Sequence, residues 1–93
     1  MNTEPFSSVW DAIEDVPELR ENLKLRSALM MALKGYMERT GLSQSQAAAL
    51  FGVTQPRVSD LVRGKIDLFS IDALVNMASA AGLQIEMRVR EAA

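Results

Sequence analysis

Hydrophobic residues recur at helical spacing through most of this 93-residue chain and change to strict alternation near its C-terminus. The spacing predicts a long helix that begins near Pro17, a residue suited to the first helical turn, and runs to about Arg39. Its apolar positions form two neighbouring stripes: Leu23, Met30, Leu33 and Met37, and beside them Leu25, Leu29, Ala32 and Tyr36. So wide an apolar surface predicts burial on more than one side, by the domain itself and, as a further interpretation, by a second subunit.

Two short helices joined by a tight turn are predicted in the middle of the chain. Ser43 followed by Gln46 has the spacing of a capping box, so one helix should begin there. Gly52, which can adopt a left-handed conformation, should end it. Thr54 is the next N-cap, and Pro56 lies in the first turn of the second helix, where its missing N–H is tolerated.

Each of these short helices has one apolar face, formed by Ala47, Leu50 and Phe51 in the first and by Val58, Leu61 and Val62 in the second. The small Ala48 lets the two helices cross closely, which predicts a helix-turn-helix that ends at Gly64. Stepping 100° per residue from the buried Val58 directs a polar set away from the core. This set is Gln55, Pro56, Arg57, Ser59, Asp60 and Arg63.

The segment after the second short helix predicts a turn in which Ile66, Leu68 and Phe69 pack inward. Ser70 can cap one more helix, which the apolar spacing extends to Gly82.

Beyond Gly82 the apolar period becomes two. Leu83, Ile85, Met87 and Val89 alternate with polar residues, which predicts a half-buried strand. A strand needs a neighbour for its backbone N–H and C=O groups. The expected neighbour is the region from residue 8 to 13, the same strand of another copy in a dimer sheet, or both.

Composition narrows the range of functions. The chain has no Cys and no His, which excludes disulfides and thiolate sites and removes the commonest general base and metal ligand. We therefore expect no catalytic residues, no metal and no cofactor. No stretch is long and apolar enough for a membrane span, and no signal sequence opens the chain, so a cytoplasmic protein is expected.

The net charge of −2 does not favour a nucleic-acid partner, but its distribution does. Residues 1–22 carry six acids against one base, a balance of −5, whereas residues 34–65 carry five bases against two acids, a balance of +3. The positive charge therefore gathers around the predicted helix-turn-helix.

The motif resembles the Xre/lambda-repressor class of helix-turn-helix proteins. The matching positions are Gln44, Ala48, Gly52, Thr54, Gln55, Val58, Leu61 and Gly64. The continuation from Gly64 to Val89 is similar to the HigA-like antitoxins and related short regulators. The resemblance implies a mainly α fold: a five-helix bundle with a C-terminal β-strand, paired in a dimer.

The expected organisation is an acidic segment with a possible short strand at 1–16, a helix-turn-helix domain at 17–82, and a strand and tail at 83–93. In the acidic segment, Trp10 could cover an edge of the core, pair as a short strand or anchor a partner protein.

The implied function is a homodimeric repressor that binds a palindromic operator in double-stranded DNA and, as an antitoxin, also binds a toxin protein. Phosphate contacts are expected from Gln44, Thr54, Arg63 and Lys65. Gln55 could bond adenine, Pro56 touch a thymine methyl and Arg57 reach guanine, unless Arg57 pairs with Asp60. The alternative, which Asp60 and the overall acidity favour, is a protein-interaction module with this fold that does not bind DNA.

Overall fold

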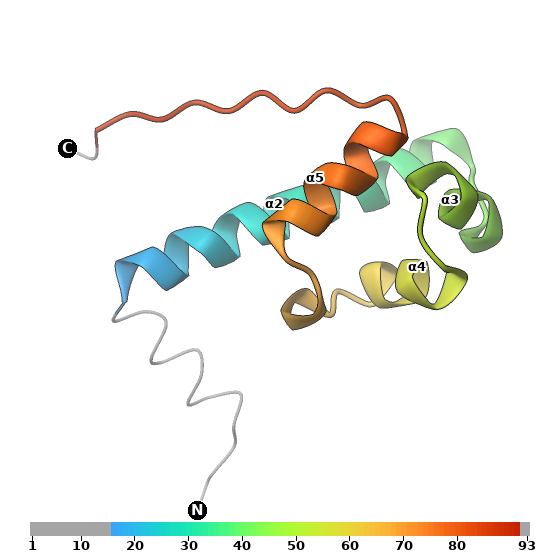
Figure 1. Ribbon diagram of the computed structural model, residues 1–93, viewed down its shortest axis with the longest axis horizontal. Helices are drawn as coiled ribbons and strands as arrows, with labels where there is room; N and C mark the ends of the chain where they lie inside the picture. The colour runs from blue at the N-terminus through green and yellow to red at the C-terminus, as the bar shows by residue number, and fades with distance from the viewer. Residues whose placement is uncertain (1–15, 92–93) are drawn as a thin grey trace, which may run out of the picture.

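The computed structural model describes residues 16–91, which form a bundle of helices around one core (Figure 1). A long helix is followed by three shorter ones, and a 3-10 turn lies before the last of them. The elements are α2 (Pro17–Thr40), α3 (Gln44–Phe51), α4 (Gln55–Val62), η1 (Ile66–Leu68) and α5 (Ile71–Ala80). Not one of these helices is long and apolar enough to cross a membrane.

The predicted helix starts are confirmed by their hydrogen bonds. The Ser43 hydroxyl accepts from the Gln46 backbone N–H at 3.0 Å, and the Gln46 side chain accepts from the Ser43 N–H at 2.9 Å, which completes the capping box. The Ser70 hydroxyl accepts from the Ala73 N–H at 3.1 Å at the start of α5. Gly52 ends α3 with a φ of 71°, the left-handed conformation in which a residue with a Cβ is strained.

The core lies where α2, α3 and α5 meet, and α4 closes it from one side (Figure 1). Its largest fully buried side chains are Phe51, Phe69, Leu33, Leu61, Leu74, Met77 and Val58. One predicted stripe of α2 is buried from Met30 to Met37. The second stripe is not: Leu25 is 44% exposed, while Leu29 and Tyr36 are half-buried.

The five-helix fold with a C-terminal strand was wrong for the part of the chain described. There it has four α-helices and a 3-10 turn, and residues 83–91 are extended without belonging to a sheet. The Leu83 N–H bonds the Ala78 carbonyl at 2.9 Å, after which the segment runs beside α2 and α5 (Figure 1). An alternating pattern alone cannot form the backbone hydrogen bonds of a sheet without a second strand. The predicted half-burial is also missing at Val89, which is 87% exposed. The proposed pairing region at 8–13 lies outside the described residues.

The turn before α5 packs differently from the prediction. Phe69 is buried and Ile66 packs against the core, but Leu68 is 45% exposed, because the short 3-10 turn directs only part of its side chains inward. The guanidinium of Arg26 in α2 donates to the Ile66 carbonyl at 3.2 Å and to the Phe69 carbonyl at 3.4 Å. Arg26 thereby connects this turn to the long helix, a role that its sequence position did not indicate.

Candidate nucleic-acid interface

The helix-turn-helix consists of α3, the turn at Gly52 and α4. Val58 and Leu61 hold α4 against the core, with exposed fractions of 0% and 1%. At the N-terminal end of α4, Gln55 and Pro56 are exposed to solvent. The predicted orientation of α4, apolar behind and polar in front, is therefore present.

The residues at the two helix N-termini differ in how available they are. Gln44 is the first residue of α3 and is half-buried. Thr54 is exposed, and its hydroxyl caps α4 by accepting from the Arg57 backbone N–H at 3.4 Å. Both residues lie where a helix dipole favours an anion such as a phosphate.

Arg57 is held against the protein by an aromatic ring. Its guanidinium carbon lies 4.2 Å from the centroid of the buried Phe69 ring, a cation–π contact. Arg57 is half-buried as a result, and the contact orients its guanidinium in the absence of DNA. Sequence reasoning missed Phe69 because it lies twelve residues further along the chain, and only the fold brings the two together.

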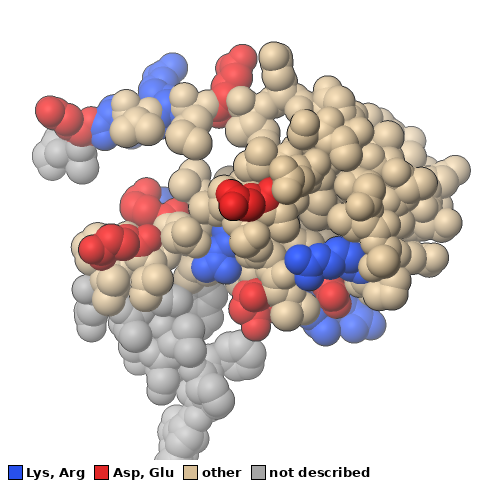
Figure 2. Space-filling model, viewed as in Figure 1, with Lys and Arg blue, Asp and Glu red and all other residues tan. Residues whose placement is uncertain are grey.

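The Asp60 carboxylate pairs with Lys65 rather than with Arg57. The Lys65 Nζ lies 3.8 Å from Asp60 Oδ1, and the two side chains are 46% and 28% exposed. Arg63 caps the C-terminal end of α4 and is exposed, whereas Ser59 is half-buried. Figure 2, drawn in the same view as Figure 1, shows basic and acidic side chains next to each other on the surface around α4.

Because Asp60 neutralises part of the charge of Lys65, Asp60→Asn should strengthen binding to duplex DNA by a few-fold at low salt, on the order of 1 kcal/mol or less. Asp67→Asn removes the same charge from the exposed η1 turn and serves as the matched control. Fluorescence anisotropy with a labelled duplex compares the two variants. Equal strengthening by both would mean that only net charge matters, and weakening by Asp60→Asn would mean that the carboxylate itself contacts DNA.

This arrangement of two short helices at a tight turn, with a solvent-facing polar edge on the second, defines a helix-turn-helix protein. A family model described as "Helix-turn-helix domain" matches residues 12–90, and the chain belongs to that family. A solved structure assigned by name to the XRE family of transcriptional regulators is 33% identical, with a TM-score of 0.71, covering 78% of this chain and 82% of its own. The chain is thus an Xre-like helix-turn-helix protein. No curated protein matched it.

Proposed function

We propose that this protein is a transcriptional regulator that binds specific duplex DNA through α4 and represses transcription, a binding function without catalysis. The observation that carries the proposal is the exposed N-terminal edge of α4, with Gln55 and Pro56 outward and Val58 buried behind them. An exposed helix edge of this kind fits the major groove, where base edges are distinguishable.

The proposed contacts divide into two groups. Gln44, Thr54, Arg63 and Lys65 contact phosphates and set the position of the protein on the duplex. Gln55, Pro56, Arg57 and Ser59 lie at or beside the base edges, with Gln55 bonding adenine as the main reading contact. Arg57 reaches the DNA while its guanidinium stacks on the Phe69 ring. Asp60 either accepts a hydrogen bond from cytosine N4 or neutralises part of the charge of Lys65.

We further infer that the protein acts as a homodimer. One helix-turn-helix reads few base pairs, and two modules related by a twofold axis read half-sites about 34 to 36 Å apart or a multiple of that distance. The second apolar stripe of α2, with Leu25 at 44% exposure, supports a subunit interface, as does the neighbouring Val75 of α5 at 37%.

The dimer predicts the form of the operator. Selection from random duplexes should yield palindromes whose half-sites are centred about 10 base pairs apart or a multiple of that. Sequencing the bound fraction through successive rounds measures this. Enriched sites without twofold symmetry would contradict the dimeric mode of binding.

We also propose that the protein is an antitoxin that represses its own operon. The support is the similarity of residues 64–89 to HigA-like antitoxins and the acidic N-terminal segment with Trp10, which lies outside the described residues. Co-purification with the product of a neighbouring reading frame, and rescue of growth when that product is expressed, tests this role. A neighbouring product that neither binds nor inhibits growth would remove it and leave the DNA-binding proposal untouched.

The alternative is a protein-interaction module with this fold that does not bind DNA. The pairing of Asp60 with Lys65 favours it, because a carboxylate on this face repels phosphate. The dependence of duplex binding on salt concentration separates the two functions, because only phosphate contacts give an affinity that falls steeply as salt rises.

A further inference from the structure

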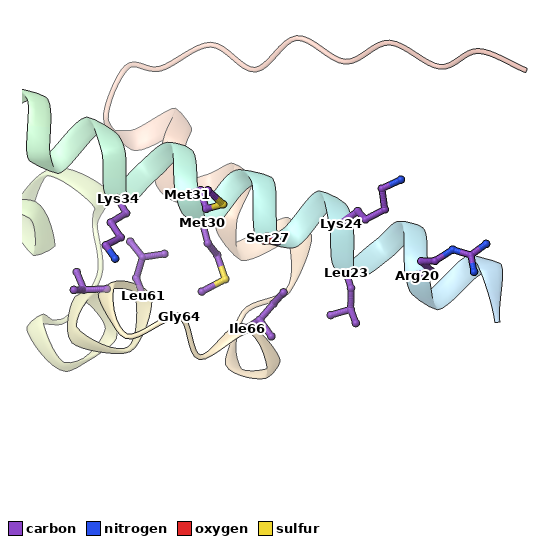
Figure 3. A pocket seen from close by; sticks show the side chains of 11 residues that line it. Arg20, Leu23, Lys24, Ser27, Met30, Met31, Lys34, Leu61, Gly64 and Ile66 are labelled. Carbon is purple, nitrogen blue, oxygen red and sulfur yellow. The ribbon is translucent and has the colours of Figure 1, made fainter. Parts of the chain in front are cut away.

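A groove separates α2, from Arg20 to Lys34, from the end of α4 and the η1 turn (Figure 3). Its volume is about 630 Å³, within the range of roughly 300 to 1,000 Å³ typical of pockets that enclose a small ligand. Leu23 and Met30 point from α2 towards the side of Leu61 and Ile66, so the floor of the groove is apolar (Figure 3). The groove therefore has room for several hydrophobic side chains.

The groove lies outside the set of residues to which we assign DNA contacts. Met31 on its edge is 70% exposed, so it adds an apolar side chain that an occupant of the groove could cover. Among the described residues that line it, every charged one is basic: Arg20, Lys24 and Lys34, of which Lys24 also pairs with Glu21 of α2 at 3.4 Å. A complementary occupant would present an apolar face flanked by carboxylates.

The beginning of this chain has that chemistry. Phe6, Val9, Trp10 and Ile13 recur at i, i+3, i+4 and i+7, which gives one apolar face. Residues 1–15 contain four acids and no base, a charge of −4 that matches the basic lining of the groove.

The same segment can reach the groove. It joins α2 at Val16, and the groove extends along α2 from Arg20 to Lys34. At a rise of about 1.5 Å per residue, Lys34 lies about 26 Å from the start of the helix. A helix from Phe6 to Ile13 is about 10 Å long, and the three residues from Ile13 to Val16 span up to about 10 Å. A chain that turns back at Val16 therefore brings Phe6 about 20 Å along α2, level with Met30.

We propose that the segment from Phe6 to Ile13 docks by its apolar face in the groove between α2 and α4 of its own chain. Asp11, the one acid within this segment, lies towards Lys24, and Glu4, two residues before the segment, lies towards Lys34. Trp10 is enclosed. The inference is independent of the proposed DNA contacts. It also places Trp10 within the protein, so a partner protein that binds Trp10 would have to displace it from the groove.

Trp10 is the only tryptophan, so its fluorescence reports the docked state in the full-length chain. In the wild type we expect blue-shifted emission and several-fold weaker quenching by acrylamide than for free tryptophan amide. Met31→Glu places a carboxylate at the groove and should release Trp10. Its emission should then shift to the red, and its quenching by acrylamide should rise to that of free tryptophan amide. Met87→Glu is the matched control, since Met87 is also 70% exposed but lies on the C-terminal segment outside the groove.

A second groove variant, Lys34→Glu, tests the charge contribution and should increase quenching without altering an apolar residue. Circular dichroism verifies that the variants keep their helices. Full quenching of Trp10 in the wild type would overturn the proposal, as would shielding that Met31→Glu and Met87→Glu leave equally unchanged. Shielding lost on dilution would also overturn it, because the occupant would then be the segment of a second copy.

Discussion

Replacing Leu61 with alanine should lower the free energy of unfolding by about 2 to 5 kcal/mol, a large part of the stability of a domain this small. Leu61 is 1% exposed and connects α4 to the core, so the shortened side chain leaves a cavity that the surrounding helices fill only in part. Urea denaturation followed by circular dichroism measures the change. Duplex binding should fall together with stability, because α4 depends on Leu61 for its position.

Leu68→Ala is the matched control, since Leu68 is 45% exposed on the η1 turn. Its removal should cost about 1 kcal/mol or less, because much of its surface already contacts water. Equal destabilisation by the two substitutions would contradict the assignment of Leu61 to the core.

Gln55→Ala should reduce discrimination at one base pair of each half-site by about 1 to 3 kcal/mol, while the fold remains intact. Gln55 is exposed at the first position of α4, and the cap of that helix is supplied by Thr54, so the substitution removes a side chain that stabilises little else. Anisotropy titrations of the selected operator and of single-base variants measure the discrimination.

Gln84→Ala, which truncates an exposed glutamine on the C-terminal segment, should leave affinity and preference unchanged. A Gln55→Ala variant with wild-type base preferences would show that sequence is read by other residues.

The local chemistry of the chain was sufficient to predict the four helices of the described residues and their order, whereas the fifth helix implied by the family resemblance is not among them. Ser43, Gly52 and Thr54 act on their own neighbours within a few residues, so their roles as caps and as a turn follow from spacing alone. The burial of Val58 and Leu61 followed from periodicity for the same reason.

The errors and omissions arose where distant segments meet. The alternation from Leu83 to Val89 predicted a strand, but a strand exists only through its neighbour, and none lies among the described residues. Arg57 was expected to contact DNA or to pair with Asp60, whereas it lies against Phe69, twelve residues further along the chain. Asp60 pairs instead with Lys65, which the turn at Gly64 brings back to the end of α4. The periodicity of α4 thus predicted its buried face, but it did not predict the contacts that hold its polar side chains in place.

The central claim is that the face of α4 meets the phosphates of duplex DNA, and the salt dependence of binding tests it most directly. We expect affinity for an arbitrary duplex to fall steeply as salt rises, because each neutralised phosphate releases bound counterions. The double variant Arg63→Gln, Lys65→Gln should lower the slope of log affinity against log salt by about one per lost phosphate contact. The control, Arg88→Gln with Arg90→Gln, removes the same charge from the C-terminal segment and should leave the slope near that of the wild type. No duplex binding at low salt, or an equal loss of slope in both double variants, would contradict the account.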